Sequence, residues 1–260
     1  MRPARFARPV PVLALVVLTL AIAAIACAAP KKKPADPRAE TGQQVRLAES
    51  YFRGGRASEA LDVLQKAIDR EPSNASLRNY YGQLSFITGR NDEAEKAFVK
   101  ALELDPYMTD ARNNLGSVYD ATGRKELAEQ QYKRALEDAA YPTPEKVCMN
   151  LGQLYASEGR MEESITQYRR AVEINPKFWR GHFELASVLD KAGKLEEAAR
   201  EYEVASPDYK GSGEYHFRLG LVYMKLNQPE KAREHFTACG QLAPGSENAS
   251  KAFELLKMIP

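Results

Sequence analysis

Residues 41–246 repeat one pattern of small and bulky residues every 34 positions, with two extra residues in the third unit, and this period constrains the fold most. Each unit has a small residue, a second small residue 12 positions later, a bulky residue after four more and a third small residue after three more. The first small position holds Ala48, Gly82, Gly116, Gly152, Ala186 and Gly220, and the bulky position holds Leu64, Phe98, Tyr132, Tyr168, Tyr202 and Phe236. A period of this length indicates stacked supersecondary units in place of one central core.

Glycine and proline mark where helices would end within each unit. The expected end of the first helix carries Gly55, Gly89, Gly123, Gly159, Gly193 and, in the sixth unit, Asn227. Gly and Asn are the residues that tolerate the left-handed conformation at a helix C-terminus. Four of the six units close on a proline: Pro72, Pro106, Pro176 and Pro244. The whole pattern resembles the tetratricopeptide repeat, in which two antiparallel helices form each unit.

We therefore predict an all-α fold, a right-handed superhelical solenoid of six tetratricopeptide helix pairs with a C-terminal capping helix. The predicted units are 41–74, 75–108, 109–144, 145–178, 179–212 and 213–246. Helices of about 14 residues are marginal alone in water, so stacking must stabilise the array. The capping helix is expected over 247–260, and its Phe253, Leu255, Leu256 and Met258 are expected to cover the last apolar face.

The N-terminal region has the order of a secretory signal. Three arginines precede an apolar run over 10–26, and small residues then precede Cys27. The stretch Ala24-Ile25-Ala26-Cys27 resembles the bacterial lipobox, although Leu is more usual than Ala at its first position. We predict a lipoprotein signal peptide over 1–26 and lipidation of Cys27. An uncleaved membrane anchor and an ordinary cleaved signal are the alternatives.

The segment that follows the lipobox cysteine differs from the repeats. Residues 27–40 contain three prolines, mixed charge and no apolar period. A proline-rich stretch of this kind is extended, at up to about 3.1 Å per residue. We therefore expect a lipidated tether that holds the repeats away from a membrane surface.

Charge and motifs argue against nucleic-acid binding and catalysis. The chain has 37 basic and 35 acidic residues, and removal of residues 1–26 leaves 34 basic against 35 acidic, a formal charge of −1. This is not the strongly basic surface of a nucleic-acid binder. No phosphate-binding glycine loop, metal-binding histidine pair or nucleophile motif is present. We expect no enzymatic activity, cofactor, metal or small-molecule substrate.

The histidines and the cysteines within the repeats are best explained by packing. His182 and His216 each occupy the fourth position of a unit, which favours a packing role over a ligand role, and His235 is expected on a solvated helix face. Cys148 and Cys239 lie nearly three units apart, too far for a disulfide. Both cysteines are expected to be buried.

The third and fifth units depart from the pattern. The third has Tyr141-Pro142-Thr143-Pro144 and lacks the closing proline, and the fifth has Pro207 early. Tolerated loop variation is one explanation; the other is that the prolines of 142–144 change the superhelical path between units three and four.

The repeats, the lipobox and this Tyr-Pro-x-Pro insertion resemble the type IV pilus biogenesis lipoproteins, the secretin pilotins known as PilF, PilW or Tgl. The resemblance implies a lipid-anchored protein on the periplasmic face of the outer membrane. There it would help a secretin to localise and oligomerise. Ala28 follows the lipobox cysteine where Asp would favour retention at the inner membrane, which is compatible with outer-membrane sorting.

Positions 2, 5, 9, 12 and 13 of the first helices line the concave surface of such arrays, and we expect a partner-binding groove there. Toward the N-terminus the groove positions are polar: Asn79, Gln83, Asn113, Ser117 and Asp120. Toward the C-terminus they are apolar: Met149, Phe183, Phe217, Leu221 and Met224. Asn amides can bond the backbone of an extended peptide without reading its sequence. A purely structural pattern is the alternative explanation.

Three functions remain open at this stage. The first is a pilotin whose protein partner is the type IV pilus secretin. The second is a lipoprotein scaffold for another envelope machine, in β-barrel assembly or cell-wall synthesis. The third, an enzyme or enzyme subunit, would need a catalytic motif or an extra domain that the repeats leave no room for.

Overall fold

The computed structural model describes residues 37–259, which form thirteen α-helices and no strand. Consecutive helices pair from α2 to α13, and α14 packs against the last pair. The helices are α2 (Pro37–Arg53), α3 (Ala57–Arg70), α4 (Ala75–Ile87), α5 (Asn91–Leu104), α6 (Thr109–Ala121), α7 (Lys125–Ala135), α8 (Pro144–Ser157), α9 (Met161–Ile174), α10 (Trp179–Lys191), α11 (Leu195–Tyr209), α12 (Gly213–Lys225), α13 (Pro229–Leu242) and α14 (Glu247–Met258). The predicted solenoid of six helix pairs and a closing helix is confirmed.

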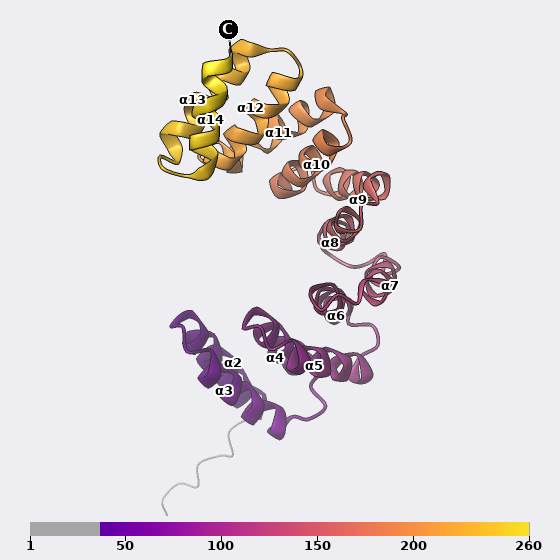
Figure 1. Ribbon diagram of the computed structural model, residues 1–260. Helices are drawn as coiled ribbons and strands as arrows, with labels where there is room; N and C mark the ends of the chain where they lie inside the picture. The colour runs from indigo at the N-terminus through magenta and orange to yellow at the C-terminus, as the bar shows by residue number, and fades with distance from the viewer. Residues whose placement is uncertain (1–36, 260) are drawn as a thin grey trace, which may run out of the picture.

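The pairs follow one another along an arc (Figure 1). The first helices of the middle units, such as α6 and α8, lie on the inner side of the arc, and their partners α7 and α9 lie on the outer side. The two ends of the array lie toward the same side. This curvature makes the first helices the lining of a concave surface.

Each first helix ends as the sequence predicts. The five glycines have φ between +75° and +78°, and Asn227 has φ +54°. These left-handed residues let the chain reverse and begin the second helix two residues later, as at Lys125 after Gly123. A β-branched or bulky residue would be strained in this conformation.

Small residues at the first repeated position allow the two helices of a unit to approach closely. A Cβ on Gly116 would lie 2.6 Å from the ring of Tyr132, and one on Gly82 would lie 2.7 Å from the ring of Phe98. The bulky side chains opposite are almost wholly buried, with Phe98 at 0% and Tyr132 at 1% exposure. The repeated small and bulky residues therefore form the contact inside each unit.

The apolar core is continuous in the C-terminal half of the molecule and divided in the N-terminal half. One cluster extends from Met149 on α8 to Ile259 after the closing helix. Separate smaller clusters join neighbouring units from the first to the fourth. The C-terminal half should therefore be the more cooperative part of the array.

The start of the first helix and the packing of the closing helix differ from the predictions. Helix α2 begins at Pro37, so residues 37–40 of the predicted tether belong to the first helix, with proline at a first helical position where its missing N–H costs nothing. On α14, Phe253 is 60% and Met258 is 76% exposed, so neither covers the last unit. The buried face of the closing helix carries Ala249 and Ala252, and the predicted Leu255 and Leu256 are partly buried and pack against the core.

The irregular units have structural consequences. In the third unit, α7 ends at Ala135, and Tyr141 of the insertion is buried, with its hydroxyl donating to Asp110 Oδ1 at 2.7 Å. In the fifth unit, α11 continues through Pro207 to Tyr209. The ring of Tyr209 then stacks on Phe183 of α10, with centroids 4.5 Å apart.

The predicted signal peptide, Cys27 and most of the tether lie outside the described residues. Between residues 37 and 259, no helix combines the length and the apolar character that a membrane span requires.

Candidate partner-binding groove

The polar half of the predicted groove is built on α4 and α6. Asn79, Gln83, Asn113, Ser117 and Asp120 are all half-buried on these helices. Their positions five, nine and twelve in each unit place them on the inner side of the arc, since these spacings follow the 3.6-residue period of one helix face.

Amide side chains connect the inner helices across three units. Asn114 Nδ2 donates to Asn79 Oδ1 at 3.1 Å, and Asn150 Nδ2 donates to Asn113 Oδ1 at 3.0 Å. A primary amide has two donors and an acceptor with two lone pairs, so each pair keeps hydrogen-bonding capacity for a ligand. Asn114 and Asn150 were missed by the sequence reasoning, although each immediately follows a predicted groove position.

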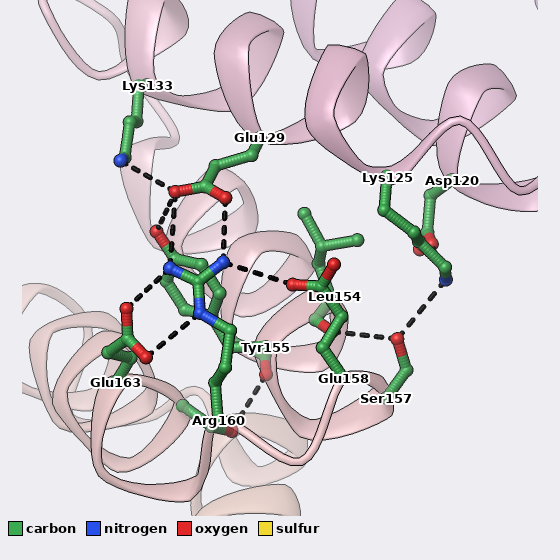
Figure 2. Close-up of polar contacts among 12 residues, drawn as sticks. Asp120, Lys125, Glu129, Lys133, Leu154, Tyr155, Ser157, Glu158, Arg160 and Glu163 are labelled. Atoms are coloured by element: carbon green, nitrogen blue, oxygen red, sulfur yellow. Dashed lines mark hydrogen bonds and ion pairs between the residues drawn. The ribbon is translucent and has the colours of Figure 1, made fainter.

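A polar cleft of about 390 Å³ lies beside these amides. It is lined by Phe86, Ser117, Asp120, Ala121, Lys125, Tyr132, Asn150 and Gln153. Lys125 Nζ pairs with Asp120 and donates to Ser157 Oγ at 3.2 Å, which orients the carboxylate (Figure 2). Tyr132 donates to Ser117 Oγ at 3.2 Å, and burial raises the pKa of Tyr132. The cleft therefore presents neutral amides and a compensated ion pair.

Two of the predicted apolar groove residues are buried instead. Met149 and Phe183 are each only 8% exposed and belong to the continuous C-terminal core. Phe183 is covered because Tyr209 stacks on it and Tyr202 contacts it edge-on, with centroids 5.3 Å apart. Neither residue offers a free surface to a partner.

The remaining apolar positions lie on α12. Phe217 and Leu221 are half-buried, and Met224 is 37% exposed. Phe217 and Leu255 line a mainly apolar cleft of about 470 Å³ together with Ser250, Lys251 and Glu254 of the closing helix. A second cleft of about 240 Å³ shares Phe217 and reaches Leu221, Arg218 and Asn248. The apolar part of the groove is thus narrower than predicted and depends on α14.

Tetratricopeptide repeat profiles match residues 45–109, 88–143, 152–193 and 213–246. Together these four ranges span most of the described helices. The chain is a tetratricopeptide-repeat protein. No curated protein sequence matches it significantly.

Three solved structures are similar in fold to this tetratricopeptide array. PilW, described as a widely conserved type IV pilus biogenesis factor, is 22% identical with a TM-score of 0.74, and the match covers 82% of this chain and 98% of PilW. PilF of Pseudomonas aeruginosa is 20% identical with a TM-score of 0.74, covering 84% and 98%. YrrB, described as having an unusual peptide-binding site, is 22% identical with a TM-score of 0.60, covering 74% and 97%. At these identities, the likeness shows the shared fold.

The turns between first and second helices carry a second repeated feature, a basic residue directly after the helix-ending glycine. Arg124 Nη2 pairs with Glu95 of the preceding unit at 2.6 Å, and Arg160 Nη1 pairs with Glu129 at 2.8 Å. Lys194 Nζ pairs in the same way with Glu162 of the fourth unit at 2.9 Å. These pairs connect successive units at the turns between first and second helices.

The contacts around Arg160 are the most extensive of these (Figure 2). Its guanidinium lies 4.1 Å from the ring centroid of Tyr155, and it also pairs with Glu158 and Glu163. Tyr155 and Lys133 contact Glu129 as well, and these partners, Arg160 first, lower the pKa of Glu129 to about 2. The ion pairs therefore stabilise the stacking of units three and four.

The histidine and cysteine side chains correct one expectation. His182 is buried and contacts Glu201, consistent with packing, but His235 is half-buried against His216 and not on a solvated face. Cys148 and Cys239 are free and wholly buried, as predicted. Across the described helices, no group of three or more His, Cys, Asp or Glu could hold a metal ion.

Proposed function

We propose that this chain is an outer-membrane lipoprotein, anchored through Cys27 on the periplasmic face, that binds a type IV pilus secretin and promotes its localisation and oligomerisation. The observation that carries the proposal is the match to PilW and PilF, with TM-scores of 0.74 over 82% and 84% of this chain, against 0.60 over 74% for YrrB. The predicted lipobox would supply the anchor that such a role requires.

The two parts of the groove suggest how a partner segment would bind. The amides of Asn113 and Asn150 would bond the main chain of an extended segment, which gives affinity without strict sequence selection. The apolar cleft at Phe217 and Leu255 would bury one large side chain of that segment. Complete burial of such a side chain is worth roughly 1.5–3 kcal/mol, so this cleft would act as the anchor point.

The cellular role can be tested in the source organism by deleting the gene and restoring it with wild type or Cys27→Ala. We expect wild type to restore detergent-resistant secretin multimers in the outer-membrane fraction on an immunoblot. The Cys27→Ala protein should fail to take up labelled palmitate and should restore few multimers. Normal multimers in the deletion strain would refute the pilotin role.

The groove can be tested with Phe217→Asp and a matched control, Tyr107→Asp. Tyr107 is 91% exposed and lies outside the groove, so its replacement introduces the same charge without touching the cleft. We expect Phe217→Asp to weaken binding to purified secretin at least tenfold, since about 1.4 kcal/mol is enough for that, and the control to bind normally.

Circular dichroism must show that both variants keep the helical content of wild type. A folded Phe217→Asp variant that binds the secretin normally would contradict the assignment of the apolar cleft as the anchor point. In that case the outer, second helices would be the next surface to examine.

A further inference from the structure

Two neighbouring units place a histidine at the same position with different partners. His182 on α10 has Nδ1 2.6 Å from Glu201 Oε2 of α11. His216 on α12 has Nδ1 2.8 Å from Nδ1 of His235 on α13. The Nε2 atom of each ring faces a backbone carbonyl of the preceding connection, Pro176 O at 3.2 Å and Lys210 O at 2.9 Å. The fifth unit thus pairs histidine with a carboxylate, and the sixth pairs it with a second imidazole.

The hydrogens of the sixth-unit pair follow from its acceptors. A carbonyl oxygen only accepts, so His216 Nε2 carries a hydrogen for Lys210 O, and the Nδ1 of a neutral His216 ring is a bare acceptor. His235 must then donate through its Nδ1–H. One added proton can bind His235 Nε2 and leave this bond intact. A second proton would place hydrogens on both Nδ1 atoms, which no hydrogen bond can join.

Aromatic rings enclose the imidazole pair. Tyr215 lies edge-on to His216, with centroids 5.0 Å apart, and 6.4 Å from His235. Tyr223 stacks on His235 at 5.5 Å. These rings limit how far water can solvate a charged pair, so two positive charges in this contact would be poorly screened.

The charged groups around His235 come from two helices. Glu203 lies on α11, and Glu234 and Lys231 lie on α13 with His235 itself. Burial, and after it the neighbouring His216, lowers the pKa of His235, and Lys231 adds to this lowering. Glu234 and Glu203 raise the pKa of His235 but do not reverse the direction of the shift. The folded chain therefore binds fewer protons here than the unfolded chain below the ordinary histidine pKa of about 6.5. It follows that stability at this contact falls as the pH falls.

We propose that His216 and His235 form a pH-sensitive latch, which holds α12 against α13 at neutral pH and releases the sixth unit when both rings are protonated. Phe217 is the next residue on α12, and α14 packs on both α12 and α13. Release would therefore loosen the closing helix and open the apolar cleft that Phe217 shares with Leu255. The latch does not depend on the identity of the partner.

Amide hydrogen exchange of the purified full-length protein tests the latch. Protection factors of α12–α14, corrected for the intrinsic pH dependence of exchange, are compared with those of α8–α9 at about pH 7.5 and about pH 5. In wild type we expect the protection of α12–α14 relative to α8–α9 to fall at least about tenfold at the lower pH. An unchanged ratio in wild type would overturn the proposal.

Two substitutions separate the latch from general acid sensitivity. His235→Glu recreates the His182–Glu201 pair of the fifth unit, so acid should preserve or increase protection of α12–α14. Should His235→Glu not fold, His235→Gln provides the second test. Its glutamine cannot be protonated, so the protection of α12–α14 relative to α8–α9 should not change with pH. His182→Gln is the matched control, and it should release α12–α14 in acid as wild type does. Loss of protection in His235→Gln equal to that of wild type would also overturn the proposal.

Discussion

The ion pair between Glu129 and Arg160 offers a direct measurement of how ion pairs between units stabilise their stacking. Glu129 lies on α7 and accepts from Arg160 and from Tyr155, while Lys133 pairs with the same carboxylate. The perturbation is Glu129→Gln, which keeps the shape of the side chain and removes its charge. Because Tyr155 and Arg160 would lose an ionised acceptor, the variant should be less stable than wild type.

The magnitude follows from the pKa of Glu129, which falls from 4.5 to about 2. At about 1.4 kcal/mol per pKa unit, this shift corresponds to an upper limit of roughly 3.5 kcal/mol. The pair lies at the surface, where solvent screens it, so we expect Glu129→Gln to reduce the free energy of unfolding by about 1–2 kcal/mol at pH 7. Arg160→Met should cost less in the Glu129→Gln background than in wild type, since the pair with Glu129 is already weakened there and only the contacts with Glu158, Glu163 and Tyr155 are left to lose.

Urea unfolding followed by circular dichroism measures the effect at a series of pH values. The folded-state pKa of Glu129 lies below its unfolded value, so its contribution is complete above about pH 4.5 and is lost as the pH falls toward about 2. The difference between wild type and Glu129→Gln should shrink over that range. The matched control is Glu162→Gln, whose carboxylate pairs with Lys194 but is 74% exposed, and its effect should be smaller. A difference that is independent of pH, or no larger than in the control, would refute the reasoning.

Three further predictions concern the core and the ends of helices. Phe183→Ala should reduce the free energy of unfolding by about 3–5 kcal/mol in urea titrations, because it empties a buried site under Tyr209; a loss below 1 kcal/mol would mean that the ring is not core. Gly159→Ala should lower stability by about 1–2 kcal/mol, because φ is +76° and alanine is strained there; unchanged unfolding would contradict this. Truncation of residues 247–260 should lower the thermal midpoint and increase exchange in α13, because α14 covers the last pair; an unchanged midpoint would show that α14 is not a cap.

Most of the fold could be predicted from the repeat. The period places residues of one kind at equivalent points of every unit, so helix ends at the glycines and burial of Tyr132 and Phe98 follow from local chemistry and spacing. Each unit contacts mainly its neighbours, so a pattern read in one unit holds for the next. The closing helix was predicted as well, with Leu255 and Leu256 against the core, but the exposure of Phe253 and Met258 was not.

The candidate site was predicted only in part. The polar groove residues lie where their positions place them, half-buried on α4 and α6. Their partners Asn114 and Asn150 were not predicted, because their amides meet residues of another unit through the curvature of the array. The contribution of Leu255 on the closing helix was missed for the same reason.

Phe183 and Phe217 show the limit most clearly. Both occupy the fifth position of a unit, and the period alone cannot distinguish them. The structure does, because α11 continues through Pro207 and brings Tyr209 over Phe183, whereas Phe217 remains open beside the closing helix. The helix pairs, their ends and the residues packed within each unit depend on spacing along one chain, so they could be predicted before the fold was known. Which groove positions stay accessible and which imidazoles meet depends on what the neighbouring helix presents, so these features appear only in the folded array.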